Sequence, residues 1–408
     1  MKRALFLPCA AGVEPLLAHE AARITGSRAE ASRGGVWVPA SRRAAMALNL
    51  ESRLAQRVLW PLCEGPYRDE HDLYRTARHE VDWAAWITPA QTLRVDVSAQ
   101  RSPLQSLNFA ALRVKDAVCD ALRDATGARP NVDTRHPDLP LALFAGPDHF
   151  TLYVDLSGEA LFKRGWRDDR KGGAKGEAPL KETLAAAMLA AAGWQGRPED
   201  GPLLDPCCGA GTIVIEAAQM ACGIAPGLQR RFAFERLLPF KTHLAEWRDL
   251  QRAAKARQHA PAVPIFAGDV SFRMTDFAAR NAERAGVKAA IEFKTADALQ
   301  RPPPAPRGTI LMNPPYGERI APKGQGSRQA FEGGGSADEF FAALAAHWKR
   351  QYPGWTAWLL SPEMKLPGLM RLKESRRVPM WNGPIECRLF RFDLVAGAHR
   401  PEASAPQQ

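Results

Sequence analysis

The chain beyond residue 175 alternates short apolar segments with stretches of helical periodicity, and this alternation constrains the fold more than any other feature. The pattern is typical of a doubly wound, largely parallel sheet. Ligands of such a sheet bind at the carboxyl ends of its strands. The predicted strands are Leu203-Leu204, Pro264 to Ala267, Ile291 to Lys294, Gly308 to Met312, and Thr356 to Leu360.

The first 165 residues show a different order of elements. Their apolar patterns predict a small β-α-β-α unit up to about residue 53, followed by a compact α/β or α+β module. A charged, glycine-rich stretch from Lys163 to Gly176 is the predicted interdomain linker. The predicted elements are a strand within residues 1–8, helices at 13–24, 44–54 and 108–122, and strands at 35–39, 92–99, 141–144 and 151–156.

The net charge indicates the class of binding partner, and the cysteine content indicates the cellular compartment. Lysine and arginine number 55 against 44 acidic residues, so the net charge is +11 and polyanionic partners are favoured, nucleic acid first. The seven cysteines form no C-x-x-C pair, which indicates a reducing, cytoplasmic compartment. The longest apolar run, Leu184 to Ala192, is too short to cross a bilayer as a helix.

A glycine turn follows the first strand of the alternating region. Asp205 ends that strand, and Gly209 and Gly211 let the backbone approach a ligand beside the amide donors of a helix N-terminus. A dinucleotide fingerprint would need a third glycine where Val214 stands, and the chain has no Gly-Lys-Ser/Thr. The turn therefore disfavours a dinucleotide and excludes a P-loop. Taken alone, it also fits a plain strand-to-helix turn.

Acidic residues follow three successive strands. Asp205 suits an ammonium or sulfonium group, Asp269 is placed to accept from two ribose hydroxyls, and Asp297 to accept from an adenine amino group. Each alone fits a helix N-cap, but the three beside a glycine turn predict an S-adenosylmethionine pocket. The adjacent Cys207 and Cys208 and the nine histidines form no ligand spacing, so we predict packing cysteines and no metal.

The tetrapeptide Asn313-Pro314-Pro315-Tyr316 follows the fourth strand. Acceptors on the Asn313 side chain and the Pro314 carbonyl can hold both hydrogens of a planar exocyclic amine and turn its nitrogen towards a methyl donor. The paired prolines stiffen the direction of that carbonyl, and the ring of Tyr316 can stack on a flipped base. Displacement at a methyl carbon needs in-line geometry, so no general base is predicted.

These motifs resemble those of known enzymes. Residues 205–218 and 313–319 are similar to the class I S-adenosylmethionine-dependent methyltransferases that modify amines. The resemblance is to the N-terminal methyltransferase of the bacterial 23S ribosomal RNA guanine-N2 methyltransferases, where a THUMP domain precedes it. Further segments similar to that family are Ala178 to Ala186, Ile224 to Leu228, Asn382 to Cys387, Arg129 to Asp133, and Leu152 to Glu159.

The resemblance implies a fold, an activity and a set of site residues. The fold is α/β, with a Rossmann-like methyltransferase domain at 175–395 preceded by a ferredoxin-like segment at 1–55 and a THUMP RNA-binding domain at 56–165. The activity is methyl transfer to the N2 amine of a guanine in 23S rRNA, with Asn313, Pro314, Pro315 and Tyr316 orienting the amine. The implied contacts to S-adenosylmethionine are Asp205, Cys207, Gly209, Gly211, Thr212, Asp269, Asp297, Glu182 and Thr183.

Three features depart from that family. Ser271 stands where a second acidic residue is usual, two positions after the ribose-binding aspartate. The loop has Cys-Gly-Ala-Gly-Thr where Cys-Gly-Ser-Gly-Thr is frequent. Some relatives carry a second methyltransferase half, and because this chain ends at Gln408 we expect no second activity.

Residues at the start of the predicted linker are the predicted RNA contacts. Lysine and arginine can track phosphate, and a tryptophan can stack on an unpaired base, although each residue alone also fits a solvated basic face. An enzyme whose target base must be extracted from folded RNA generally needs a separate domain that binds the RNA. The predicted contacts are Lys163, Arg164, Trp166 and Arg167.

The motifs leave other functions open. Asn-Pro-Pro-Tyr does not identify the ring, so an N6-adenine methyltransferase on RNA or DNA fits it, as does a glutamine methyltransferase of release factors. A non-catalytic RNA-binding ribosome-assembly factor with a relic pocket is the alternative from another class. The sequence also leaves open whether the Gly/Ser-rich segment Lys323 to Ser336 is a lid.

Overall fold

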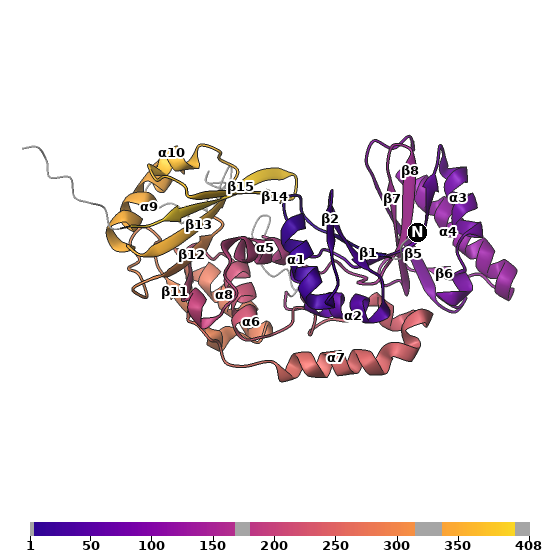
Figure 1. The fold of residues 1–408 in the computed structure, drawn as a ribbon, viewed down its shortest axis with the longest axis horizontal. Helices are drawn as coiled ribbons and strands as arrows, with labels where there is room; N and C mark the ends of the chain where they lie inside the picture. The colour runs from indigo at the N-terminus through magenta and orange to yellow at the C-terminus, as the bar shows by residue number, and fades with distance from the viewer. Residues whose placement is uncertain (1–3, 168–179, 315–336, 396–408) are drawn as a thin grey trace, which may run out of the picture. The chain divides into compact units, whose positions relative to one another are not determined.

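The computed structural model describes residues 4–167, 180–314 and 337–395, which form two compact units (Figure 1). No single cut in the sequence separates the two units. The domain boundaries predicted near residues 55, 165 and 175 stay predictions. The first unit consists of 4–167, 182–187 and 223–259, and the second of 180–181, 188–222, 260–314 and 337–395.

One eight-stranded sheet runs through the first unit, in the order β2-β3-β1-β4-β8-β7-β5-β6. Phe6 on β1 pairs with Leu59 on β4, so the two predicted front modules share this sheet. The pairs are antiparallel except for β5, which runs parallel to β7 and β6. The strands are β1 (Ala4–Pro8), β2 (Glu30–Ser32), β3 (Gly35–Pro39), β4 (Leu59–Pro66), β5 (Thr92–Ala99), β6 (Asn131–Val132), β7 (Leu139–Ala145) and β8 (His149–Asp155).

Helices of the first unit include one from late in the chain. Helix α7 lies against α2 (Figure 1), and Arg43 Nη1 of α2 donates to Glu246 Oε1 of α7 at 2.8 Å. The Gly227 amide donates to the Leu50 carbonyl at 2.9 Å, which fixes the chain leading to α7. The helices are α1 (Glu14–Thr25), α2 (Arg42–Glu51), α3 (Glu70–His79), α4 (Leu107–Thr126) and α7 (Leu244–Ala256), with short 3-10 helices at Trp83–Ala85, Ala233–Arg236 and Leu238–His243.

The second unit contains a seven-stranded sheet in the order β11-β10-β9-β12-β13-β15-β14. The first five strands of that order are parallel, and β15 runs antiparallel to both β13 and β14. Chain order runs outward from the β9–β12 pair, to β10 and β11 on one side and to β13 on the other, which makes this pair the topological switch point. The strands are β9 (Leu203–Asp205), β10 (Ile265–Asp269), β11 (Ile291–Thr295), β12 (Gly308–Met312), β13 (Trp355–Ser361), β14 (Arg376–Asn382) and β15 (Ile385–Asp393).

Both faces of the central strands are covered. Leu204, Ile310 and Leu359 pack with aromatic residues of α9 in one apolar cluster. Because side chains alternate along a strand, Leu203 and Leu311 point to the other face, and both are fully buried. Such strands need near-continuous apolar sequence, which the short runs supply. The remaining helices are α5 (Glu182–Ala192), α6 (Thr212–Ala221), α8 (Phe272–Arg284), α9 (Ala337–Gln351) and α10 (Leu366–Met370), with 3-10 helices at Pro198–Asp200 and Lys288–Ala290.

The structure confirms the predicted doubly wound sheet, and each of its five predicted strands lies within two residues of an observed one. The hairpin of β14 and β15 was not predicted. Its signal is the dipeptide Asn382-Gly383, a turn pair flanked by β-type sequence, and Gly383 has φ +64°. In the first unit, the elements missing from the prediction are β2, β4, α3 and β6.

Gly227 offers a test of how the segment 223–259 packs. A Cβ added there would lie 2.6 Å from the Asn49 carbonyl oxygen and 2.8 Å from Leu50 Cα, and both are backbone atoms that cannot move aside cheaply. We expect Gly227→Ala to lower the free energy of unfolding by about 1–3 kcal/mol. Gly65→Ala is the control, because nothing lies within 4 Å of its added Cβ. Chemical denaturation followed by circular dichroism compares the two; equal stability would contradict the observed packing.

Candidate active site

Polar residues meet at the carboxyl edge of the second sheet. Leu204 pairs with Ile310 between β9 and β12, and Asp205 pairs with Ala267 between β9 and β10. This parallel register brings the end of β9 beside the residues that follow β10 and β12. The edge at the switch point is the place where doubly wound sheets bind ligands.

The turn after β9 is fixed by hydrogen bonds from neighbouring elements. The Cys208 amide donates to the Gly268 carbonyl of β10 at 2.7 Å, and Asn281 Nδ2 of α8 donates to the Ala210 carbonyl at 2.9 Å. Gly211 caps α6 with φ +84°, and an added Cβ would lie 2.9 Å from the Cβ of Ala278. Glycine is needed here because the backbone is left-handed and the helix behind it is close.

Asp205 is an almost fully buried carboxyl group, 1% exposed. Its Oδ1 accepts a hydrogen bond from the Cys207 amide at 3.1 Å. Burial raises the pKa of Asp205 to about 8, the negative charge of Asp269 adds to the rise, and the Cys207 amide and the Arg301 guanidinium oppose it. At neutral pH such a group is mostly protonated, and a cation beside it favours the ionised form.

Asp269 ends β10 as predicted, whereas Asp297 lies two residues beyond the end of β11, and both carboxylates accept hydrogen bonds from the backbone. Asp269 Oδ2 accepts from Gly209 and Oδ1 from Ser271, both at 3.0 Å, while burial raises its pKa. Asp297 Oδ1 accepts from the Leu299 amide at 2.9 Å. Each carboxylate oxygen has a second lone pair. Their roles toward ribose and adenine stay predictions.

Asn313 follows β12 directly and carries an acceptor that is buried without a partner. No hydrogen bond reaches its Oδ1 within the parts of the chain that the structure describes. A buried acceptor without a donor costs free energy, so it is retained where a ligand supplies the donor. Pro314 follows it and is buried. Pro315, Tyr316 and the segment 323–336 lie outside the described residues.

Arg301 is a site residue that the sequence did not reveal. Its side chain is 3% exposed, and its Nη1 donates to the Ala267 carbonyl of β10 at 2.9 Å. An added Cβ on Gly268 would lie 2.4 Å from that nitrogen, so Gly268 makes room for the guanidinium. The backbone carbonyl of Arg301 accepts from Tyr352 Oη at 2.9 Å. This arrangement places a buried positive charge beside Asp205, and no local sequence signal predicts it.

The remaining predicted cofactor residues lie in both units. Cys207 is half-buried in the turn and Thr212 is the buried first residue of α6, both in the second unit. Burial raises the pKa values of the Cys207 and Cys208 thiols, which keeps them protonated at neutral pH. Glu182 and Thr183 begin α5 and belong to the first unit, where Glu182 Oε1 accepts from Arg167 Nε at 2.5 Å.

The four predicted RNA contacts differ in exposure. Lys163 is exposed and pairs with Glu159 at 3.0 Å. Arg164 is buried and donates to the carbonyls of Leu161 and Arg53, and Trp166 is only 1% exposed, with Arg167 over its ring at 4.9 Å. The structure therefore corrects the expectation that Trp166 presents a free ring face, because the side chain is buried. Contact with RNA by the other residues stays a prediction.

The described residues contain neither a membrane-spanning helix nor a cluster of metal ligands. Within 4–167, 180–314 and 337–395, no helix has the length and apolar character needed to cross a membrane. No cluster of three or more His, Cys, Asp or Glu within those ranges is arranged to hold a metal ion.

Family models match three parts of the chain. Residues 164–391 match the RMKL-like methyltransferase domain, residues 67–155 the THUMP domain, and residues 4–59 the RlmL ferredoxin-like domain. The first match covers more than half of the 408 residues.

Curated relatives and solved structures are similar over nearly the whole chain. "Ribosomal RNA large subunit methyltransferase K/L" of Shewanella amazonensis is 36% identical over 395 residues, which cover 95% of this chain and 53% of that protein. The chain thus spans about half the length of such relatives. A methylase from Listeria monocytogenes, described as N6-adenine-specific for DNA, is 25% identical with a TM-score of 0.80, covering 96% of each chain. SMU.472, a methyltransferase solved with SAH, is 24% identical with a TM-score of 0.81, covering 96% of this chain and 99% of that one.

The sheet order and these structural matches place the second unit among the class I methyltransferases, whose methyl donor is S-adenosylmethionine. Within that class, the chain belongs to the family of the RMKL-like methyltransferase domain. The match to the family confirms the resemblance inferred from the motifs, and the matched THUMP and ferredoxin-like domains confirm the predicted order of the modules.

The residues at the edge of the sheet fit the methyl donor. Asp205 supplies a buried carboxyl group that can pair with a cation, and the turn at Gly209 and Gly211 leaves room for close approach. Asn313 Oδ1 is a buried acceptor for which the described residues provide no donor.

The raised pKa of Asp205 makes binding of the cationic donor depend on pH. The protonated carboxyl must release its proton to pair with the ligand, so affinity falls as the pH drops below about 8, by up to tenfold per unit. Isothermal titration calorimetry from pH 6 to 9 measures the Kd of S-adenosylmethionine for the wild type and for Asp205→Asn. The ratio of the two Kd values cancels titration of the ligand itself. A ratio that is constant over this range would contradict the assignment of Asp205.

Proposed function

We propose that the protein transfers the methyl group of S-adenosylmethionine to the N2 amine of a guanine in 23S ribosomal RNA. The observation that carries the proposal is the buried Oδ1 of Asn313, which follows β12 and has no hydrogen-bond partner among the residues that the structure describes. Relatives of the chain that are named for the RNA of the large ribosomal subunit support 23S RNA as the substrate. The matched THUMP domain supports an RNA substrate over free nucleotides. The net charge of +11 favours the same polyanion.

For this reaction the protein mainly has to position the amine in line with the methyl group of the donor. The amine lone pair attacks the methyl carbon in line with the departing sulfur, which keeps the electron pair of the broken bond, and the amine then loses a proton to water. Asn313 Oδ1 accepts one amine hydrogen and the Pro314 carbonyl accepts the other, which turns the nitrogen lone pair towards the methyl carbon and reduces its delocalisation into the ring. Asp205 and the glycine turn hold the donor at the neighbouring strand end.

Each remaining site residue has a proposed role in the same step. Asp269 holds the ribose of the donor and Asp297 its adenine, with Cys207 and Thr212 lining the turn. Glu182, Thr183, Pro315 and Tyr316 carry the roles that the family resemblance implies. Because 23S RNA is made and assembled in the bacterial cytoplasm, we place the protein there.

Methylation of an adenine N6 amine is the second candidate. The likeness to a methylase described as N6-adenine-specific for DNA, at 25% identity over 96% of the chain, favours it. An asparagine acceptor binds the amine of either ring, so the two functions differ in the product and share the site.

Product analysis separates these candidates. The full chain is incubated with labelled S-adenosylmethionine and, separately, with total rRNA lacking the modification, duplex DNA and a release factor, and the labelled unit is identified after digestion. We expect label in N2-methylguanosine from 23S rRNA. Label in N6-methyladenine would establish the second candidate, and label in protein would overturn both.

Asn313→Ala removes the proposed acceptor without adding bulk. We expect its turnover to fall by about 10²-fold or more, because a misplaced amine loses its near-attack geometry, while its Kd for S-adenosylmethionine stays that of the wild type. Asn108→Ala, at an exposed position of α4, is the matched control and keeps full turnover. Single-turnover assays with 23S rRNA measure the loss. Undiminished turnover of Asn313→Ala would remove the observation on which the proposed chemistry rests.

A further inference from the structure

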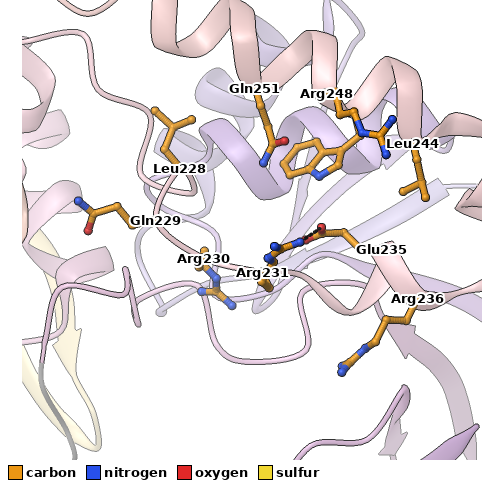
Figure 2. A pocket seen from close by; sticks show the side chains of 10 residues that line it. Leu228, Gln229, Arg230, Arg231, Glu235, Arg236, Leu244, Arg248 and Gln251 are labelled. Carbon is orange, nitrogen blue, oxygen red and sulfur yellow. Dashed lines mark hydrogen bonds and ion pairs between the residues drawn. The ribbon is translucent and has the colours of Figure 1, made fainter.

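The first unit contains a cavity of about 620 Å³ that has no role in the site described above. It lies between helix α7 and the chain segment 228–236, as Figure 2 shows. Its charged lining residues are four arginines and one glutamate, which leave three positive charges in excess. They are Arg230, Arg231, Arg236, Arg248 and Glu235.

Two of these arginines are fixed in place by the protein. The Arg230 guanidinium lies 5.0 Å from the centre of the Phe232 ring, and burial lowers its pKa to about 10, so it remains a cation at neutral pH. Arg236 Nη2 donates to the Pro137 carbonyl at 2.8 Å, and its Nε lies 3.4 Å from the Asp138 carboxylate. The carbonyls that accept from Arg230 are those of Ser157, Glu159, Ala160 and Lys163.

The other two arginines are available to a ligand. Arg248 is exposed on α7, and within the described ranges it has neither an ion pair nor a hydrogen bond. The side chain of Arg231 is 93% exposed, and its contact with Glu235 at 3.4 Å is a surface ion pair that a ligand can replace at little cost. In Figure 2, Arg248 comes from the helix and Arg231 from the opposite segment.

The wall that presents Arg248 is rigid. Trp247, next to it on α7, is 2% exposed and meets the rings of Phe232 and Phe234 edge to face at 5.7 and 5.1 Å. The salt bridge of Arg43 with Glu246 fixes the start of the same helix. A site whose wall is already ordered loses less entropy when it binds a ligand.

We propose that this cavity binds the sugar–phosphate backbone of the RNA, with Arg231 and Arg248 as the phosphate contacts; the inference rests on the proposed function. Guanidinium groups match phosphate oxygens in pairs and are weakly hydrated, which makes arginine the preferred phosphate ligand. The volume exceeds that of a single phosphate group, and the amide of Gln251 on α7 adds a neutral group suited to a ribose hydroxyl. Backbone contacts position the RNA without reading its sequence.

The test compares a double variant with a control that removes a single arginine from the same helix outside the cavity. Arg231→Gln with Arg248→Gln removes both contacts, and Arg252→Gln removes one exposed arginine of α7 that is paired with Asp249 and lies outside the cavity lining. Fluorescence anisotropy with a 23S rRNA fragment measures Kd over a range of salt concentrations. We expect the double variant to lose on the order of tenfold affinity per arginine and its log–log salt slope to fall by about 1 per arginine. The control changes Kd by less than about twofold.

The outcomes separate this inference from the proposed function. Wild-type affinity and salt slope in the double variant, with label still transferred to 23S rRNA by the wild type, would overturn the cavity assignment and leave the function intact. A wild type that neither binds nor labels any RNA would overturn both. Loss of affinity for a polyglutamate peptide without loss for RNA would assign the cavity to an acidic protein partner and overturn the proposal. Thermal melts of the variants equal to the wild type exclude unfolding as the cause.

Discussion

The hydrogen bond from the Gly209 amide to the Asp269 carboxylate, with that from the Cys208 amide to the Gly268 carbonyl, is the constraint on which the site depends. The two bonds tie the turn after β9 to the end of β10. They can form because β9 and β10 are parallel and in a fixed register, which brings successive strand ends to one edge. The glycine conformations, the start of α6 and the position of Asp205 all follow from this one junction.

The same junction buries acidic groups whose negative charge is only partly compensated by the protein. Burial raises the pKa values of both Asp205 and Asp269, and the negative charge of Asp269 further disfavours ionisation of Asp205. The positive charge of Arg301 opposes part of the rise in the Asp205 pKa, and burial lowers the pKa of Arg301 itself. A cationic methyl donor supplies the positive charge that the site lacks. Its binding therefore favours the ionised form of the buried carboxyl groups, and this attraction offsets the free energy lost on burying them.

How much the sequence predicts depends on the range of the interaction involved. Strands β9 to β13 and the acidic residues at their ends follow from local runs such as Leu203-Leu204 and from the alternation of strand and helix. Trp166 and Arg301 do not follow in this way, because Trp166 has the sequence context of an exposed stacking residue and Arg301 begins a proline-rich loop, yet both are buried. The printed partners of Arg301, Ala267 and Tyr352, lie far from it in the sequence. Segment 223–259 belongs to the first unit for the same reason, since its partners Asn49, Leu50 and Glu51 lie far away in sequence. Long-range packing leaves no periodicity to detect.

The proposed chemistry also shows where specificity must arise. The Asn313 side-chain oxygen recognises an amine hydrogen, and guanine and adenine both present a planar amine. Discrimination therefore requires contacts to other ring atoms, or a grip on the RNA that presents one nucleotide and withholds the rest. Arginines such as Arg231 and Arg248 cannot read a base through its phosphate, but they can fix the register of a folded RNA. In that arrangement the side-chain oxygen of Asn313 does not need to distinguish guanine from adenine, because the fold of the bound RNA determines which amine is placed beside it.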